Sequence, residues 1–315
     1  MPIIVYPCAL WPPHGYARDM KVLLAGASGM IGRELKTQLR TQGHQTRALL
    51  RSPGGDYQWD ARPGSVPGDA LDWADALVSL NGASLTHLPW TSSYRVQIHD
   101  SRVDATTALA QAIAASSNPP AVWVSGSAVG IYGDCGDTDL DERSPTGDSF
   151  LADVVRDWER AASPAEEATR IVFARTGIVL GTEGALKPLA TTTRLGLGAR
   201  VGSGTQWWPW VSLLDEVRAI AFALVTEGLS GPVNIVGPTP ATADEITRAV
   251  ATTLHRPYLL RLPSSIIKLA MSGADELLLS SQKAHPRALL NAGFDFRCTR
   301  AEDAIAGLFP HVLTS

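Results

Sequence analysis

The sequence predicts an α/β protein, with a doubly wound parallel sheet followed by a smaller, mostly helical lobe at the C-terminus. Three observations support this prediction. Short apolar runs alternate with amphipathic segments over the first two thirds of the chain, as they do in repeated βαβ units. A glycine-rich turn, GASGMIG at 26–32, joins the first apolar run to the first amphipathic segment. After Pro238 the pattern becomes mostly helical, and Thr242 with Glu245 forms the signature of a helix start.

Each element follows from its own pattern. KVLLA at 21–25 is a short apolar run followed by glycine, which predicts a buried strand. Ile31, Leu35 and Leu39 then repeat every four residues and predict a helix with one buried stripe, ended by Gly43. Right-handed crossovers between such strands give a doubly wound sheet. By the same criteria, further strands are predicted at 45–50, 76–80, 121–125, 171–175 and 233–236, and further helices at 101–116, 149–162 and 213–227.

The pattern divides the chain into three parts. Residues 21–180 together with 211–237 carry the strand–helix alternation and are predicted to form a nucleotide-binding domain. Residues 181–210 together with 238–315 break it and are predicted to form a substrate-binding or cap lobe over the crevice. Residues 1–20 lack the basic start and long apolar core of a signal peptide. They are expected to be an extension, either a dispensable arm or the product of an upstream start codon.

Composition narrows the classes of ligand. The 315 residues carry a formal net charge of −4 with Lys and Arg scattered, so no nucleic-acid partner is expected. No apolar run reaches the roughly 18 residues of a membrane span, so no membrane partner is expected either. Cys8, Cys135 and Cys298 lie far apart and the seven histidines are dispersed, so neither a metal site nor a disulfide framework is expected. A reducing, cytoplasmic location fits this cysteine usage, and the expected partner is a small molecule.

The turn at 26–32 has the glycine spacing of a dinucleotide-binding fingerprint. Gly26 permits a turn that a side chain would block, Gly29 leaves room for a pyrophosphate, and Gly32 lets helix and strand pack closely. The N-terminus of the following helix would present free N–H groups to the phosphates. A glycine-rich turn without a ligand is the alternative, but the flanking strand and helix are the context that the fingerprint requires.

The end of the second strand predicts which cofactor is bound. An acidic residue at this place holds the ribose 2′-hydroxyl of NAD, whereas an arginine accommodates the 2′-phosphate of NADP. Here the strand ends in Leu50, Arg51 and Ser52, and no acidic residue occurs before Asp56. We therefore expect NADP(H), with the 2′-phosphate on Arg51 and Ser52. A solvated surface arginine is the alternative.

Several segments, taken together, resemble the extended short-chain dehydrogenase/reductase and epimerase superfamily. The first are AGASGMIG at 25–32, SLNGASL at 79–85, SRVDATTAL at 101–109 and VSGSAVGIYGD at 124–134. Others narrow the resemblance to a subgroup labelled nucleoside-diphosphate-sugar-epimerase-like or "cell division inhibitor". These are FLADVVRDWERAA at 150–162, ARTGIVLG at 174–181, residues 196–220, GPVNIVGPTPAT at 231–242 and SSQKAHPRALLNAGFDF at 280–296. The resemblance runs from about Lys21 to about Leu308. It implies a Rossmann domain, NADP binding and a C-terminal lobe, but no substrate.

The resemblance also implies roles for residues at the strand ends. Residues 81–83 would lie along the adenosine and ribose part of the cofactor. Ser125 and Ser127 would lie beside the nicotinamide, and residues 175–178 would line the crevice for nicotinamide and substrate. The full set of expected cofactor-binding residues is Gly26, Ser28, Gly29, Met30, Ile31, Gly32, Arg51, Ser52, Asn81, Gly82, Ala83, Ser125, Arg175, Thr176 and Gly177.

The residues that usually transfer the proton in this superfamily are missing. Its active members use a Tyr-x-x-x-Lys pair, in which the lysine lowers the pKa of the tyrosine. None of the six tyrosines here has lysine four positions on, and the helix expected to carry the pair reads FLADVV at 150–155. The remaining catalytic candidates are Ser127, whose counterpart binds the reacting oxygen in relatives, and Tyr132, a potential proton donor. For Tyr132, simple packing near the crevice is the favoured alternative.

Other side chains in the same region are weaker candidates. The acids near the expected crevice are Asp134, Asp153 and Glu159. Three tryptophans would form either an apolar wall for a substrate or, as such clusters more often do, part of the lobe core. They are Trp207, Trp208 and Trp210.

Two functions stay open. The first is an NADP(H)-dependent oxidoreductase or epimerase-like enzyme with an altered proton relay, acting on a carbonyl compound or a sugar nucleotide. The second is a non-catalytic NADP-binding module that senses redox state or binds a protein. The missing Tyr/Lys pair favours the module, whereas the expected crevice favours the enzyme and inclines the prediction toward it. A homodimer is also left open, since related proteins often pair through helices but no exposed apolar stripe demands it here.

Overall fold

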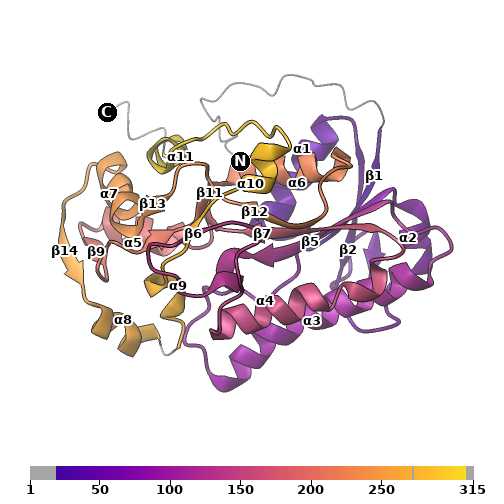
Figure 1. The fold of residues 1–315 in the computed structure, drawn as a ribbon, viewed down its shortest axis with the longest axis horizontal. Helices are drawn as coiled ribbons and strands as arrows, with labels where there is room; N and C mark the ends of the chain where they lie inside the picture. Colours follow the sequence, from indigo (N-terminus) through magenta and orange to yellow (C-terminus); the bar gives the residue numbers. More distant parts are fainter. Residues whose placement is uncertain (1–18, 272, 310–315) are drawn as a thin grey trace.

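A seven-stranded parallel sheet forms the centre of the computed structural model, which describes residues 19–271 and 273–309 (Figure 1). Almost all of the predicted extension at 1–20, and residues 310–315 of the predicted lobe, lie outside the described residues. The strand order is β12-β7-β5-β4-β1-β2-β3. The strands span Lys21–Ala25 (β1), Gln45–Leu50 (β2), Tyr57–Gln58 (β3), Ala76–Ser79 (β4), Val122–Ala128 (β5), Arg170–Thr176 (β7) and Gly231–Ile235 (β12).

The strand order creates a crevice at one edge of the sheet. From β1 the chain adds β2 and β3 on one side, and then crosses to β4 on the other side of β1. From there β5, β7 and β12 extend the sheet in the second direction. Because the direction reverses between β1 and β4, the loops that follow these two strands diverge, and ligands bind in such places in open α/β sheets.

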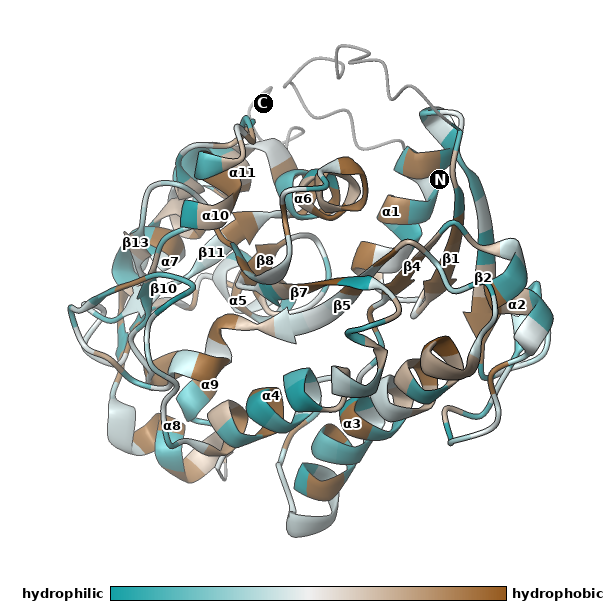
Figure 2. Ribbon diagram, turned by 45° about the vertical axis from the view of Figure 1, so that its right-hand side comes forward, coloured by the Kyte–Doolittle hydropathy of each residue, from teal (hydrophilic) through white to brown (hydrophobic). Residues whose placement is uncertain are grey.

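Helices cover both faces of the sheet, which confirms the doubly wound fold (Figure 2). One face carries α1 and α6 and the other carries α3 and α4, with the short α2 at its end. Side chains of β1 alternate between two cores, Val22 and Leu24 toward α1 and Leu23 toward α3, as the period of a strand requires. The bounds are Met30–Thr41 (α1), Gly68–Trp73 (α2), Ser92–Ala115 (α3), Phe150–Arg160 (α4) and Leu213–Val225 (α6).

Helix α3 and strand β3 are among the elements that differ from the sequence prediction. Helix α3 begins at Ser92 rather than at residue 101, with Thr91 as its N-cap accepting a hydrogen bond from the backbone N–H of Tyr94. Apart from the buried Ile98, residues 92–100 are exposed or half-buried, so they carry no apolar stripe that would reveal a helix. Strand β3 was not predicted, because two residues paired to the edge of β2 leave no periodic pattern.

A second core lies in the C-terminal lobe, where Trp208 and Trp210 pack with Ile246, Val250 and Leu308. The predicted helices are present, and short strands lie among them that are too brief for periodicity to reveal. No helix within the described ranges is long and apolar enough to cross a lipid bilayer. The lobe and its connections comprise β8 (Ile178–Leu180), α5 (Leu186–Arg194), β9 (Gly198–Val201), β10 (Trp207–Trp208), β11 (Trp210–Ser212), β13 (Ala241–Thr242), α7 (Ala243–Thr253), β14 (Tyr258–Leu262), α8 (Ser264–Met271), α9 (Glu276–Leu279), α10 (Arg287–Asn291) and α11 (Ala301–Leu308).

Candidate dinucleotide-binding site

The turn between β1 and α1 has the backbone geometry that its glycines predict. Gly26 adopts φ +85°, and a Cβ there would lie 2.7 Å from the carbonyl group of Leu80. A Cβ on Gly32 would lie 2.4 Å from the carbonyl oxygen of Gly26. At Gly29, in contrast, the nearest atom would be 3.6 Å away, so this glycine borders free space. The turn therefore packs tightly behind Gly26 and Gly32 and stays open in front of Gly29.

Helix α1 offers its free N–H groups to that open space. Its N-cap is Gly29, which has no side chain to accept a hydrogen bond from the first turn, and the first turn holds no acidic residue. An N-terminus of this kind attracts anions through unpaired N–H groups and the helix dipole. Arg33 lies one turn further on, where it donates to the carbonyl oxygen of Ser28 and forms an ion pair with Glu183. The turn is thus fixed in place while the N–H groups at the start of α1 stay free.

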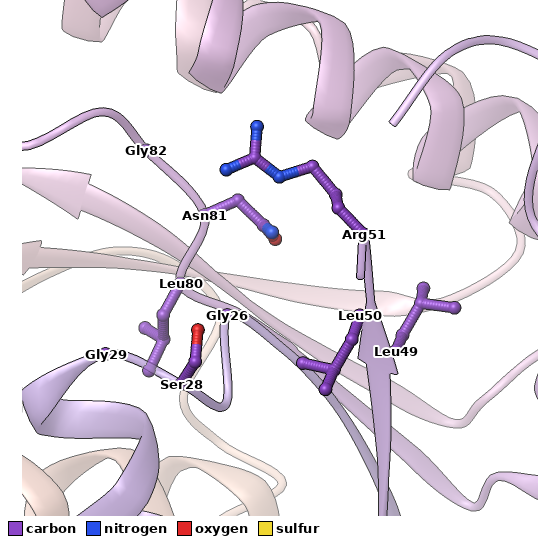
Figure 3. A pocket seen from close by; sticks show the side chains of 9 residues that line it. All are labelled: Gly26, Ser28, Gly29, Leu49, Leu50, Arg51, Leu80, Asn81 and Gly82. Atoms are coloured by element: carbon purple, nitrogen blue, oxygen red, sulfur yellow. The ribbon is translucent and has the colours of Figure 1, made fainter. Parts of the chain in front are cut away.

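A groove runs from this turn to the end of β2 (Figure 3). In Figure 3 the side chains of Arg51, from β2, and Asn81, from the end of β4, extend into the same space. Asn81 Oδ1 is buried and has no hydrogen-bond partner among the described residues. A buried acceptor without a donor is costly, so a ligand with a hydroxyl or amino donor fits here. The lining residues are Gly26, Ser28, Gly29, Leu49, Leu50, Arg51, Leu80, Asn81 and Gly82.

Helix α3 holds the Asn81 turn in position. The backbone N–H of Ala83 donates to Ser101 Oγ at 2.8 Å, and Arg102 Nη2 donates to the carbonyl oxygen of Ala83 at 3.2 Å. Burial lowers the pKa of Arg102 to about 10, and a Cβ on Gly82 would lie 2.9 Å from the Cζ of this guanidinium. Sequence reasoning assigned no role to Ser101 and Arg102. Their signal lay only in the SRVDATTAL segment, because nothing local indicates which loop they support.

A second hollow continues the groove beyond Arg51. The two hollows share Arg51, Asn81 and Gly82, and the second extends between the loop after β3 and one side of α3. Most of its walls are polar and include both arginine and aspartate side chains. The further lining residues are Asp60, Ala61, Arg62, Ser93, Val96, Gln97, Asp100, Ser101, Asp104 and Ala105.

The ends of β5 and β7 carry a buried polar cluster. Ser127 Oγ donates to Glu159 Oε1 at 2.6 Å, and Arg175 donates to both carboxylate oxygens of Glu159. The side chains of Arg175 and Glu159 are 7% and 13% exposed. The expectation that Arg175 lines the crevice is thereby corrected, because its guanidinium is enclosed and committed to the carboxylate.

Tyr132 belongs to the same cluster. It is 1% exposed, donates to Asn234 Oδ1 at 2.8 Å and accepts from Arg175 Nη1 at 3.1 Å, and burial raises the pKa of its phenol. A hydroxyl with both partners inside the protein and a raised pKa is a poor proton donor for a bound substrate. The catalytic role suggested for Tyr132 does not agree with this geometry, whereas the packed alternative does.

The other expected cofactor residues fall outside the groove lining. Ser52 is exposed beside Arg51, and Ser125 is fully buried within β5. Thr176 donates to Glu216 Oε1 at 2.7 Å on the α6 side of the sheet, and a Cβ on Gly177 would lie 2.0 Å from the carbonyl oxygen of Pro209. The residues at the start of α1 and in the supported turn lie next to the groove. They are Met30, Ile31, Gly32 and Ala83.

The weaker candidates are all engaged within the protein. The carboxylate of Asp134 accepts from the backbone N–H of Ser281, and Asp153 pairs with Arg156 at the surface. Trp208 and Trp210 belong to the core of the lobe, as tryptophan clusters more often do, rather than to a substrate wall. The third, Trp207, is partly exposed and donates to Asp137 Oδ1 at 2.8 Å. Within the described ranges, no three His, Cys, Asp or Glu side chains gather to hold a metal ion.

Fold and groove together define a Rossmann-type protein with a groove at the switch between β1 and β4. The chain belongs to the NAD-dependent epimerase/dehydratase family, whose model matches residues 22–237. A domain of unknown function (DUF1731) matches residues 262–308. The resemblance to extended short-chain dehydrogenases and epimerases is thus confirmed, whereas the "cell division inhibitor" label stays a prediction.

Individual relatives cover nearly the whole chain. An epimerase family protein of Mycobacterium leprae is 40% identical over 296 residues, which are 92% of this chain and 96% of that protein. The crystal structure of the human epimerase family protein SDR39U1 (isoform 2) with NADPH has a TM-score of 0.84 and 31% identity, covering 92% of this chain and 99% of that one. The structure of a nucleoside-diphosphate sugar epimerase from Corynebacterium glutamicum has a TM-score of 0.78 and 36% identity, covering 93% of this chain and 59% of that chain.

Proposed function

We propose that this chain binds NADPH in the groove between the glycine turn and Arg51, and that it is an oxidoreductase or epimerase-like enzyme acting on a small molecule. One observation carries the cofactor part: Arg51 stands at the end of β2 and shares the groove with Asn81, whose buried Oδ1 lacks a donor. An arginine at this strand end suits a 2′-phosphate. The relative SDR39U1, crystallised with NADPH, supports the same choice.

The chain's own residues hold the cofactor in a defined way. The N-terminus of α1 and the backbone around Gly29 would bind the pyrophosphate. Asn81 Oδ1 would accept from a ribose hydroxyl or the adenine amino group, on a turn that Ser101 and Arg102 keep in place. Arg51 would meet the 2′-phosphate with a charge-assisted hydrogen bond.

Ser127 is the proposed contact for the reacting oxygen. NADPH, when bound, supplies a hydride. The hydroxyl proton of Ser127 is directed at Glu159, so the oxygen of Ser127 keeps lone pairs that can accept from a substrate hydroxyl. In the oxidation direction Glu159, fixed by Arg175, would take up the substrate proton through Ser127, and in the reduction direction the same path would run in reverse and return a proton to the carbonyl oxygen. This arrangement would replace the missing Tyr/Lys pair. The proposed substrates are carbonyl compounds or sugar nucleotides.

A non-catalytic NADP-binding module is the second candidate, and the start of α4 favours it. Phe150 begins the helix that carries tyrosine and lysine in active members, and here it packs against Trp90, with the Arg95 guanidinium 4.0 Å from its ring centroid. Apolar packing at this place leaves neither a hydroxyl nor an ammonium group at Phe150. Such a module would respond to cofactor binding rather than turn over a substrate.

Titration of the purified chain with NADPH and NADH, followed by cofactor fluorescence, tests the cofactor assignment. We expect NADPH to bind more tightly than NADH, and Arg51→Glu to remove this preference by weakening NADPH selectively. Arg256→Glu is the matched control, because Arg256 is exposed in the C-terminal lobe and lines neither hollow. An equal loss of both nucleotides in Arg51→Glu, or no loss, would contradict the assignment.

A turnover screen separates the two candidate functions. NADPH oxidation is followed with a panel of carbonyl compounds and sugar nucleotides, for the natural chain and for Ser127→Ala. The enzyme proposal expects turnover that Ser127→Ala abolishes while NADPH affinity stays the same. Tight NADPH binding without turnover on the whole panel would favour the module.

A further inference from the structure

The second hollow brings two arginines toward one space. Arg51 comes from the end of β2 and Arg62 from the loop that follows β3, and both line this hollow. Because Arg51 also lines the first groove, a ligand that reaches Arg51 along the groove borders the hollow that Arg62 lines. The two side chains come from segments that the sequence separates by a strand and a turn, so only the fold unites them.

Neither arginine is neutralised by a strong ion pair inside the described ranges. Arg51 forms no ion pair there, and the nearest carboxylate to Arg62 is Asp60 at 4.0 Å, the outer limit of such a contact. Both members of that pair are largely exposed, at 80% and 61%, so water screens their attraction. Two arginines on one side of a hollow, with only the exposed Asp60 beside them, favour the binding of an anion on that side.

The loop that carries Arg62 is held in an unusual conformation. Ala61 adopts φ +63°, a left-handed backbone that residues with a side chain rarely take, at a cost of order 1 kcal/mol. The backbone N–H of Arg62 meets both Asp60 Oδ1 and Ser65 Oγ at 3.1 Å, and Ser65 Oγ donates back to the carbonyl oxygen of Arg62 at 2.6 Å. Trp59, which is 3% exposed, is packed in the core and anchors the chain just before this loop. Strain at a ligand-lining position, fixed by cross-bonds, is characteristic of functional loops.

The opposite wall of the hollow is acidic. Asp100 and Asp104 lie four residues apart on α3 and thus on one face of the helix. Carboxylates there would repel a phosphate but accept hydrogen bonds from amino and hydroxyl groups. The hollow is therefore polarised, because both arginines, with Asp60 beside Arg62, lie on the sheet side, whereas the charged side chains on the helix side are both acidic. A 2′-phosphoadenosine matches this polarity, because it joins a dianionic phosphate to a ribose and a base that carry donors.

We propose that Arg62 joins Arg51 in binding the 2′-phosphate of NADPH, so that selection of NADPH over NADH depends on two arginines from different loops. The inference rests on the proposed function, because it concerns one end of the same cofactor. In this proposal the left-handed backbone at Ala61 directs Arg62 toward the hollow. The proposal also makes Arg62 a specificity-determining residue, outside the strand end where such residues are sought in sequence.

Affinity measurements by calorimetry test this inference in the full chain. The probes are NADPH, NADH and adenosine 2′,5′-bisphosphate, the last of which carries the 2′-phosphate but no nicotinamide. The variants are Arg62→Gln, Arg51→Gln, the double variant, and Arg256→Gln as control. In Arg62→Gln we expect the dissociation constants of NADPH and of the bisphosphate to rise about tenfold, a typical effect of losing one charge-assisted phosphate contact. NADH binding should change by less than about twofold, and the double variant should bind NADPH no better than NADH.

Three outcomes would overturn the inference. If Arg62→Gln leaves NADPH affinity unchanged while Arg51→Gln reduces it, the 2′-phosphate is bound without Arg62 and the proposed function still stands. If Arg62→Gln weakens NADH as much as NADPH, Arg62 supports the loop or the adenine and not the phosphate. If the natural chain binds neither nucleotide, the proposed function fails as well. Unchanged thermal unfolding of each ligand-free variant excludes a loss of fold as the cause.

Discussion

Arg175 and Glu159 form a two-point ion pair in the interior, with Arg175 Nε 2.8 Å from Glu159 Oε1 and Nη2 2.9 Å from Oε2. The pair ties the end of β7 to α4, and Ser127 donates to the same carboxylate. Parallel hydrogen bonds of this kind fix the orientation of both side chains. Arg175, which the sequence analysis expected to line the crevice, thus belongs to the buried cluster that orients Ser127.

Glu159→Gln should destabilise the protein strongly. The amide cannot neutralise Arg175, and an uncompensated buried charge costs about 3 kcal/mol. The measurement is the free energy of unfolding in urea. Asp153→Asn is the matched control on the same helix, because its pair with Arg156 is exposed, and it should cost no more than about 1 kcal/mol. Equal effects of the two substitutions would show that the buried pair contributes nothing beyond a surface one.

Glu216 should make stability depend on pH. Burial raises the pKa of this carboxyl from 4.5 to about 8, and its Oε2 has no partner in the described part of the chain. Between these two values the unfolded chain has released the proton while the folded protein keeps it. The folded state then binds more protons, so the free energy of unfolding falls as the pH rises, by up to about 1.4 kcal/mol per pH unit.

Urea unfolding at several pH values between 5 and 8.5 at constant ionic strength, for the natural chain and Glu216→Gln, measures this contribution. Since glutamine does not ionise, the stability of Glu216→Gln relative to the natural chain should increase steadily toward alkaline pH. Glu167→Gln, at an exposed site, should show no such trend. A constant difference between Glu216→Gln and the natural chain at all pH values would mean that Glu216 ionises normally inside the protein.

Substitutions at two glycines of the turn should affect nucleotide affinity and folding stability differently. Gly29→Ala meets no atom closer than 3.6 Å, so the protein should stay folded within about 1 kcal/mol of its normal stability. The added methyl group would nevertheless project into the space in front of the turn, and both NADPH and NADH should bind at least tenfold more weakly, by a rough estimate. Gly32→Ala places its Cβ 2.4 Å from a carbonyl oxygen and should instead lower the melting temperature. Thermal unfolding and nucleotide titration on both variants check this contrast.

Ser101→Ala should weaken the two nucleotides equally. It removes the acceptor for the backbone N–H of Ala83, and one such hydrogen bond is worth about 1 kcal/mol, or roughly fivefold in affinity. The effect would act through the Asn81 turn, for which we propose a contact to a part common to NADPH and NADH. Ser163→Ala, at an exposed residue far along the chain, serves as control in the same titration. A loss confined to NADPH would place Ser101 at the 2′-phosphate instead.

Local features of the site were predictable because their signal is contained in a few neighbouring residues. The spacing of the glycines at 26, 29 and 32 predicts the turn. The apolar run at 45–50 predicts a strand, and Arg51 directly follows it. The role of Arg175 was predicted wrongly because its sequence signal is equally local. A strand-end arginine such as Arg175 looks alike in sequence whether it meets solvent, a ligand or a carboxylate on another helix.

By itself the sequence determined the alternating pattern, hence the doubly wound sheet, the glycine turn before α1 and the missing Tyr/Lys pair. Each depends on periodicity or on spacing within a few residues. Only the tertiary structure decided that Arg62 shares a hollow with Arg51, that Arg102 supports the Asn81 turn, and that Tyr132 is enclosed. These contacts join segments that lie on different elements. Which of them meet depends on packing over the whole molecule, which no local pattern encodes.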